Sequence, residues 1–214
     1  MKGVTMNIKR IFFCLALLGA FSGGILISQT GWAKEIYPVK GEVLVAQPFQ
    51  DKLGSGAIVY SHFRDNETTS TLHVYRFNKE KGKLVKIWQI NDGIQNCKHD
   101  CAYAAFTDEN EPMKKFSPII TDLDGNGLKE IWTGYVYSCT DEFGPSCDGS
   151  ASLKIIMYEG KKKYAMRGDT QWCDLGGRGT MDAAFKSGPE VFRLYAQKLW
   201  NRWRVGGPEK AFCK

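Results

Sequence analysis

The sequence predicts a mainly β protein, built from antiparallel meanders, with one C-terminal helix packed on the sheet. Two observations lead to this fold class. Runs of alternating apolar and polar residues, separated by polar or glycine-containing turns, recur from about residue 43 to residue 167. Such runs are typical of antiparallel strands with one buried face. A helical period is found only near the C-terminus, over residues 189–203.

Four strands are expected in the N-terminal half of the chain. Val43 and Val45 indicate a first short strand. Three longer apolar runs follow, and Asp, Asn, Lys and Gly residues lie between them. Because such residues form short turns, consecutive strands are expected to pair antiparallel as a meander. The three runs are Gly56–Arg64, Thr71–Phe77 and Leu84–Ile90.

Four further strands are expected in the second half, as two pairs. The run Pro118–Thr121 leads into a polar loop, and Ile131–Tyr137 leaves it. Leu153–Tyr158 and Tyr164–Arg167 are separated by a turn at residues 159–162, which is typical of a hairpin.

The last element expected is a helix over residues 189–203. Pro189 suits the first helical position, and Gly-Gly-Pro at 206–208 suits the end of the helix. So broad an apolar face favours packing on the sheet. A membrane-surface helix is the alternative, because basic residues flank the aromatic ones. The apolar positions are Val191, Phe192, Tyr195, Ala196, Leu199, Trp200 and Trp203.

Residues 1–33 have the layout of a secretory signal peptide. Three basic residues precede an uncharged apolar run at 11–28, and Gly31-Trp32-Ala33 places small residues at both cleavage-site positions. We expect cleavage after Ala33 and export to the periplasm or the cell exterior. An uncleaved anchor is the alternative, because the run is near the lower limit for a membrane span.

The composition left after cleavage fits a single β-rich domain over residues 34–214. That domain has 181 residues (214 − 33), with 26 basic and 23 acidic residues and a net charge of +3 (26 − 23). Nothing in it indicates nucleic-acid binding, since a solvated hairpin turn explains the basic run at 161–163. We expect a monomer without stable membrane insertion.

Six cysteines remain after cleavage, and an even count in an exported chain predicts disulfides. Two of them, Cys173 and Cys213, lie apart from the others and are expected to pair. The remaining four allow two arrangements: Cys97–Cys101 with Cys139–Cys147, or Cys97–Cys139 with Cys101–Cys147.

Residues 122–130 read Asp-Leu-Asp-Gly-Asn-Gly-Leu-Lys-Glu and carry the most specific chemical signal. Calcium takes about 6–8 oxygen ligands, and a tight loop with oxygen-bearing side chains at alternate positions directs them at one point. Gly127, at loop position 6, permits the sharp turn. The alternative is a polar hairpin turn without an ion. The predicted side-chain ligands are Asp122, Asp124, Asn126 and Glu130.

The loop is not an EF-hand, because loop position 12 is Thr133 and both flanks read as strands. It resembles the FG-GAP or VCBS calcium loop of integrin α-chain propellers. The wider stretch, PIITDLDGNGLKEIWTGYVYSC followed by LKIIMYEGKKKYAMRG, resembles a family of exported bacterial proteins often labelled surface-polysaccharide-biosynthesis proteins. This resemblance covers residues from about 84 to 168.

The resemblance implies a small or partial propeller-like β domain and a calcium ion. It also implies the backbone carbonyl of Leu128 as a fifth ligand. At loop position 5 the usual acid is replaced by Asn126.

Catalytic motifs are scarce. His62 and His73 would lie opposite each other if the first hairpin had a four-residue loop, but two histidines without a third ligand make a poor zinc site. Asp141 and Glu142 offer a carboxylate pair of the kind that glycosidases use, as many surface loops do. The sequence therefore favours a calcium-stabilised, non-catalytic envelope protein that binds glycan or protein and is linked to surface polysaccharide. The alternative is a periplasmic or secreted hydrolase acting on that polysaccharide.

Overall fold

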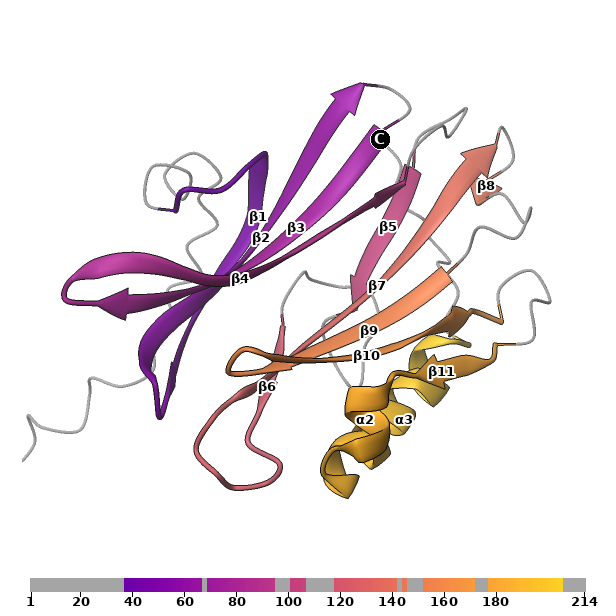
Figure 1. Ribbon diagram of the computed structural model, residues 1–214. Helices are drawn as coiled ribbons and strands as arrows, with labels where there is room; N and C mark the ends of the chain where they lie inside the picture. Colours follow the sequence, from indigo (N-terminus) through magenta and orange to yellow (C-terminus); the bar gives the residue numbers. More distant parts are fainter. Residues whose placement is uncertain are drawn as a thin grey trace, which may run out of the picture.

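The described part of the chain forms two antiparallel sheets and two helices, which are arranged in three layers (Figure 1). The sheet nearer the C-terminus lies in the middle, with the other sheet on one face and the helices on the opposite face. This confirms the mainly β fold class with a C-terminal helix packed on a sheet. The computed structural model describes residues 37–66, 69–94, 101–106, 118–141, 144–145, 152–171 and 177–205.

The N-terminal sheet is a four-stranded meander in the order β1-β2-β3-β4. The polypeptide reverses tightly between β3 and β4, where Lys81 and Gly82 have φ of 48° and 79°. A four-stranded antiparallel meander is also the unit of a propeller blade, so the propeller-like description is compatible with this sheet. The strands are β1 (Glu42–Asp51), β2 (Gly54–Asn66), β3 (Thr69–Glu80) and β4 (Lys83–Ile94).

The first strand is longer than the short strand that Val43 and Val45 predict. It continues through Pro48, which lies opposite Ala57 of β2. Proline has no N–H to donate and is tolerated on a sheet edge. In the described sheet β1 pairs only with β2, so Pro48 lies on an edge strand.

The C-terminal sheet has the order β11-β10-β9-β7-β5, and both β6 and β8 also pair with β7. Two of these pairings agree with the sequence prediction. They are the pairing of β6 with β7, which flank the polar loop, and the hairpin of β9 with β10. Three short strands, β5, β8 and β11, were not expected. The strands are β5 (Cys101–Phe106), β6 (Ile119–Thr121), β7 (Glu130–Asp141), β8 (Gly144–Pro145), β9 (Ser152–Glu159), β10 (Lys162–Asp169) and β11 (Gly179–Met181).

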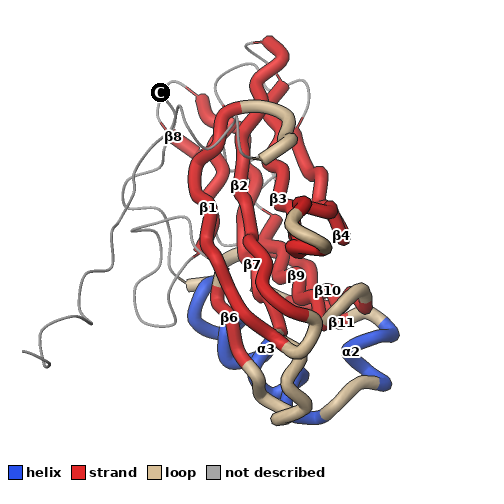
Figure 2. The backbone as a smooth tube through the Cα atoms, turned by 90° about the vertical axis from the view of Figure 1, so that its left-hand side faces the viewer, coloured by secondary structure: helices blue, strands red, loops and turns tan. Residues whose placement is uncertain are grey.

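The two sheets pack face to face around a buried apolar cluster (Figure 2). Trp88 of β4 stacks on Tyr158 of β9, with ring centroids 4.1 Å apart. The hydroxyl groups of Tyr60 and Thr133 lie 3.0 Å apart and join β2 to β7. Aromatic stacking and a satisfied buried hydrogen bond together align the sheets.

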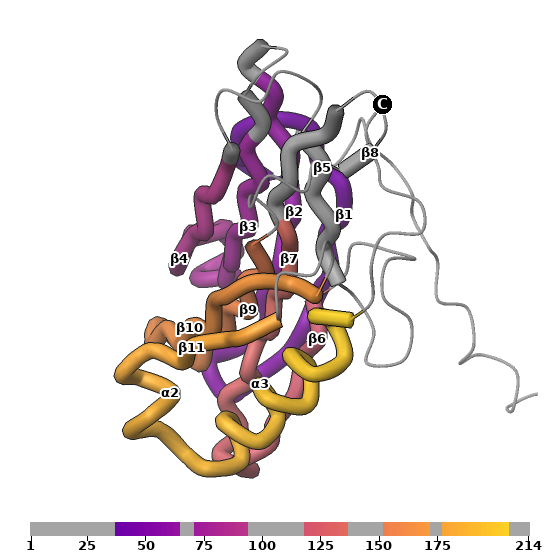
Figure 3. The backbone as a smooth tube through the Cα atoms, turned by 90° about the vertical axis from the view of Figure 1, so that its right-hand side faces the viewer, coloured from indigo at the N-terminus to yellow at the C-terminus, as the bar shows by residue number. Residues whose placement is uncertain are grey.

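Two helices, α2 (Ala183–Ser187) and α3 (Glu190–Trp203), cover the other face of the C-terminal sheet (Figure 3). The apolar face of α3 is buried, as predicted, apart from the partly buried Val191. Pro189 is the N-cap of α3 rather than its first residue. Neither helix of the described residues is long and apolar enough to cross a membrane.

The turn between β1 and β2 joins the N-terminal sheet to the polar loop of the other sheet. The backbone N–H of Lys52 donates to the carbonyl oxygen of Gly127 at 2.8 Å. A buried ion pair anchors this turn, since Nη2 of Arg76 lies 2.7 Å from Oδ2 of Asp51 and both side chains are fully buried. The other oxygen of Asp51 accepts from the N–H of Leu53 at 2.8 Å.

Candidate metal centre

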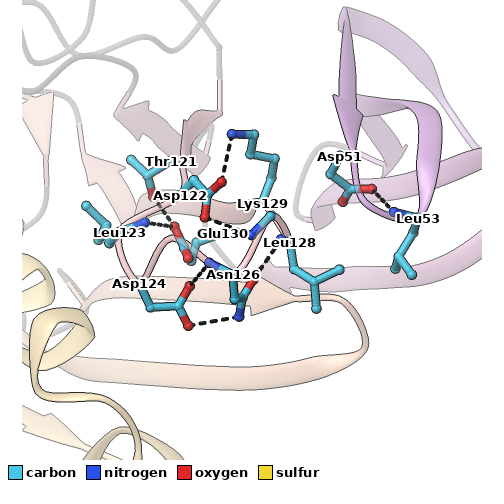
Figure 4. A network of polar contacts seen from close by, with 11 residues as sticks. Asp51, Leu53, Thr121, Asp122, Leu123, Asp124, Asn126, Leu128, Lys129 and Glu130 are labelled. Carbon is cyan, nitrogen blue, oxygen red and sulfur yellow. Dashed lines mark hydrogen bonds and ion pairs between the residues drawn. The ribbon is translucent and has the colours of Figure 1, made fainter.

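The polar loop connects β6 to β7, and these two strands pair at its base. Thr121 lies opposite Glu130 in that pairing, so the first strand residue after the loop closes it. The indole N–H of Trp132 donates to Oγ1 of Thr121 at 2.9 Å and ties the base to the core. The loop side chains converge above this base (Figure 4).

Three predicted ligands, Asp122, Asp124 and Glu130, meet at one point. Each offers a carboxylate oxygen, and these oxygens lie within 4.8 Å of one another. Calcium–oxygen distances are about 2.3–2.6 Å, so two oxygens on one ion lie at most about 5 Å apart. The three carboxylates therefore fit around a single calcium ion. Smaller hard cations such as magnesium bind the same kind of oxygen.

Glu130 is the best-defined member of the group. Its side chain is fully buried, and Oε2 accepts from Oγ1 of Thr121 at 2.6 Å and from the N–H of Leu123 at 2.9 Å. The second oxygen, Oε1, is buried and has no hydrogen-bond partner among the described residues. Burial raises the pKa of Glu130, and the nearby charge of Asp124 raises it further. Hydrogen bonds from Thr121, from Leu123 and from the backbone of Glu130 itself act in the opposite direction. A buried oxygen without a donor is costly, and a cation would satisfy it.

Asp122 is held in its ionised form at the start of the loop. Its Oδ1 accepts from the N–H of Gly127 at 3.2 Å, and Nζ of Lys129 lies 3.3 Å from Oδ2. The pKa of Asp122 is lowered, chiefly by the hydrogen bond from Gly127 and then by Lys129. Gly127 has a φ of +82°, a conformation that favours glycine, so the predicted role of this residue in the turn is confirmed.

Asn126 links the loop to the hairpin of β9 and β10. Its Oδ1 accepts from the N–H of Leu128 at 2.7 Å. Its Nδ2 donates to Oδ2 of Asp124 at 2.9 Å and to Oε1 of Glu159 at 2.5 Å. Asn126 therefore lies beside the carboxylate group with its NH2 group toward Asp124, and its part as a ligand stays a prediction. The backbone carbonyl of Leu128 also stays a predicted ligand.

Glu159 is the residue that sequence reasoning missed. It is the last residue of β9 and lies opposite Glu130 in the pairing of β9 with β7. Four carboxylates are thus gathered around the loop, with the ammonium group of Lys129 beside one of them. Nothing in the loop sequence points to Glu159, because its place depends on the register of another strand.

The described residues test little of the cysteine predictions, because most of the cysteines lie outside them. Only Cys101 and Cys139 lie in described strands, and the backbone register places them opposite each other in β5 and β7. Neither arrangement expected from the sequence contains this pair. The signal peptide at 1–33 also lies outside the described residues, as do Cys97, Cys147, Cys173 and Cys213.

Among the described residues, the other candidate chemical groups are not brought together. His62 lies opposite Leu72, whereas His73 lies opposite Ser61, so the predicted histidine pairing was wrong. The register shift between Arg64 and Asn66 accounts for the difference, because the pairing of Asn66 with Thr69 would otherwise continue to His62 opposite His73. Asp141 ends β7, and its proposed partner, residue 142, lies outside the described residues.

Fold and loop together define a mainly β protein with a candidate site for a hard cation. Comparisons with known proteins find no matching family model, no matching curated protein and no matching solved structure. The resemblance to exported bacterial proteins therefore stays an expectation from the sequence.

Proposed function

We propose that residues 122–130 bind one calcium ion that stabilises the fold. The observation that carries this proposal is the buried Oε1 of Glu130, which has no donor among the described residues and belongs to a group of three converging carboxylates. A polar turn without an ion requires no such oxygen. The candidate ligands are the side chains of Asp122, Asp124, Asn126 and Glu130 and the carbonyl of Leu128.

Calcium is favoured over magnesium by the number of protein ligands. Magnesium prefers a small octahedral shell and usually keeps several waters. Five protein oxygens leave about one to three positions for water in a shell of six to eight ligands, which suits calcium. The ion would also offset the repulsion among the carboxylates around the loop. Its role is structural in this proposal, because protein oxygens fill most of the shell and the described residues place no catalytic group beside it.

At the level of the whole protein, we propose an exported, disulfide-bonded envelope protein that binds glycan or protein without catalysis. The signal-peptide layout, the even number of cysteines and the calcium loop support this function. A hydrolase would require a carboxylate with a raised pKa facing a cleft. Among the described carboxylates a raised pKa belongs to Glu130, which is held inside the loop by Thr121 and Leu123. No observation on the described residues therefore favours the hydrolase.

Two measurements test the proposal. Calorimetric titration of the exported protein with calcium tests the site, and one bound ion per chain is expected. A binding screen against surface glycans and envelope proteins, run with calcium and with chelator, tests the function. Calcium-dependent capture of one ligand class is the expected result, whereas turnover of a polysaccharide would overturn the non-catalytic assignment.

A further inference from the structure

Glu159 stands beside the metal centre without belonging to the group of converging carboxylates. In an antiparallel pair, directly opposite side chains share one face with Cβ atoms about 4.5–5.5 Å apart, and like charges there are destabilising. Glu159 and Glu130 occupy such opposite positions. Glu159 is nevertheless outside the set of Asp122, Asp124 and Glu130 whose oxygens meet within 4.8 Å. A contact that compensates the charge of the second carboxylate lowers this cost.

Glu159 has such a compensating contact with Asn126. A side-chain amide offers one oxygen and one NH2 group, and only the oxygen is a calcium ligand. Both hydrogens of the Asn126 NH2 group have acceptors, namely Oε1 of Glu159 at 2.5 Å and Oδ2 of Asp124 at 2.9 Å. The amide oxygen accepts one hydrogen bond, from Leu128, and a carbonyl oxygen has a second lone pair for an ion.

We propose that Glu159 is a positioning residue for the calcium ion, because it holds the NH2 group of Asn126 and thereby determines which amide atom faces the ion. This inference rests on the proposed calcium site. A charged acceptor holds an amide more firmly than a neutral one. The hydroxyl group of Tyr164 donates to the other oxygen of Glu159 at 3.4 Å and supports it from β10.

The same contact explains why loop position 5 carries an amide instead of an acid. The Asn126 NH2 group donates to two carboxylates at once. Asn126→Asp would replace this donor by a further negative charge facing both Asp124 and Glu159. The residue at position 5 and the residue at the end of β9 therefore form a matched pair.

The test is the calcium affinity of single variants, measured by calorimetric titration of the exported protein. Removal of a group that orients a metal ligand typically weakens metal binding about 10–100-fold, so Glu159→Ala should raise Kd at least about 10-fold. Glu159→Gln should recover most of this loss, because its amide oxygen still accepts from Asn126. Glu80→Ala is the matched control, since it removes an equal charge from an exposed position at the end of β3 and should leave Kd unchanged.

Repeating the substitution in the Asn126→Asp background separates orientation from charge. A carboxylate has an oxygen on either side, so nothing remains to be oriented. Glu159→Ala should then raise Kd by no more than about 3-fold, the effect of one nearby screened charge. Melting temperature in chelator checks that each variant folds. Glu159→Met, which keeps the aliphatic part of the side chain, replaces the alanine variant if that variant fails to fold.

Each outcome decides the proposal. Equal losses in both backgrounds, or a glutamine variant no better than the alanine variant, would show that Glu159 acts only through its charge and would overturn the positioning role. In that case the calcium site itself would stand. An unmodified protein that binds no calcium would overturn the site and the positioning role together.

Discussion

The indole ring of Trp203 occupies the space that a side chain at residue 134 would fill. A Cβ atom built on Gly134 of β7 would lie 2.1 Å from Cζ3 of Trp203, well inside van der Waals contact. The last turn of α3 therefore packs directly on the backbone of the C-terminal sheet. Trp203 is fully buried there.

Gly134→Ala is expected to destabilise the protein through this contact. Overpacking a close-packed interior typically costs about 1–3 kcal/mol, and a ring wedged between helix and sheet has little room to shift. Urea unfolding followed by circular dichroism measures the change. In the Trp203→Leu background the same glycine substitution should cost less, since the obstructing ring is gone. Equal costs in both backgrounds would mean that the ring is not the obstacle.

Calcium should raise the melting temperature and chelator should lower it. A ligand that binds only the folded state at 100 times its Kd adds about 2.7 kcal/mol, which corresponds to a shift of about 5–10 °C for a domain of this size. Asp122→Ala should abolish the difference, because Asp122 is one of the three converging carboxylates. Magnesium should substitute poorly. A melting curve that does not respond to calcium between micromolar and millimolar concentrations would show that the loop is a polar turn without an ion.

Peptide mapping of the unreduced protein is expected to recover Cys101 linked to Cys139. The register places them opposite each other in β5 and β7. Opposite residues of antiparallel strands have Cα atoms about 4.5–5.5 Å apart, which lies within the range of disulfides. Titration of the denatured, unreduced protein should then find no free thiol. Recovery of Cys97–Cys101 or Cys97–Cys139 would instead support one of the arrangements expected from the sequence.

Stability should fall as the pH drops below about 6.5, the ordinary pKa of histidine. Burial lowers the pKa of His62, the charge of Arg64 adds to this, Glu42 opposes it and His73 adds slightly. His62 therefore binds a proton more readily in the unfolded chain than in the folded one. The loss of stability begins as the pH falls to the pKa of His62 in the unfolded chain, and it is complete below the pKa of His62 in the folded protein. His62→Gln should flatten the profile of unfolding free energy between pH 7.5 and 5.5. An unchanged slope would exclude His62 as the titrating group.

The sequence was most informative where the decisive residues lie close together in the chain. Asp122 and Glu130 belong to one nine-residue loop, so their spacing alone predicts convergence. The apolar positions of α3 share one face because the helical period is regular over its length. In both cases local geometry determines which side chains meet.

The remaining features depend on strand register or on weak local signals. Glu159 reaches the loop only because β9 pairs with β7 in one register, which no short motif encodes. The strand β5 has the sequence CAYAAF, and alanine has low preference for strands. At three residues, β11 is too short to show alternation. One register shift near Asn66 was enough to move His62 away from His73.

The hydrogen bond from Lys52 to Gly127 also bears on folding kinetics. These residues are far apart in the chain and meet only when both sheets are assembled. Loop closure between residues this far apart is entropically costly, so we expect this contact to form late in folding. Interactions absent from the transition state act on the unfolding rate. We therefore expect calcium, by rigidifying the loop that receives this hydrogen bond, to slow unfolding while leaving the refolding rate nearly unchanged. The ion would then govern how long the folded state lasts rather than how quickly it forms.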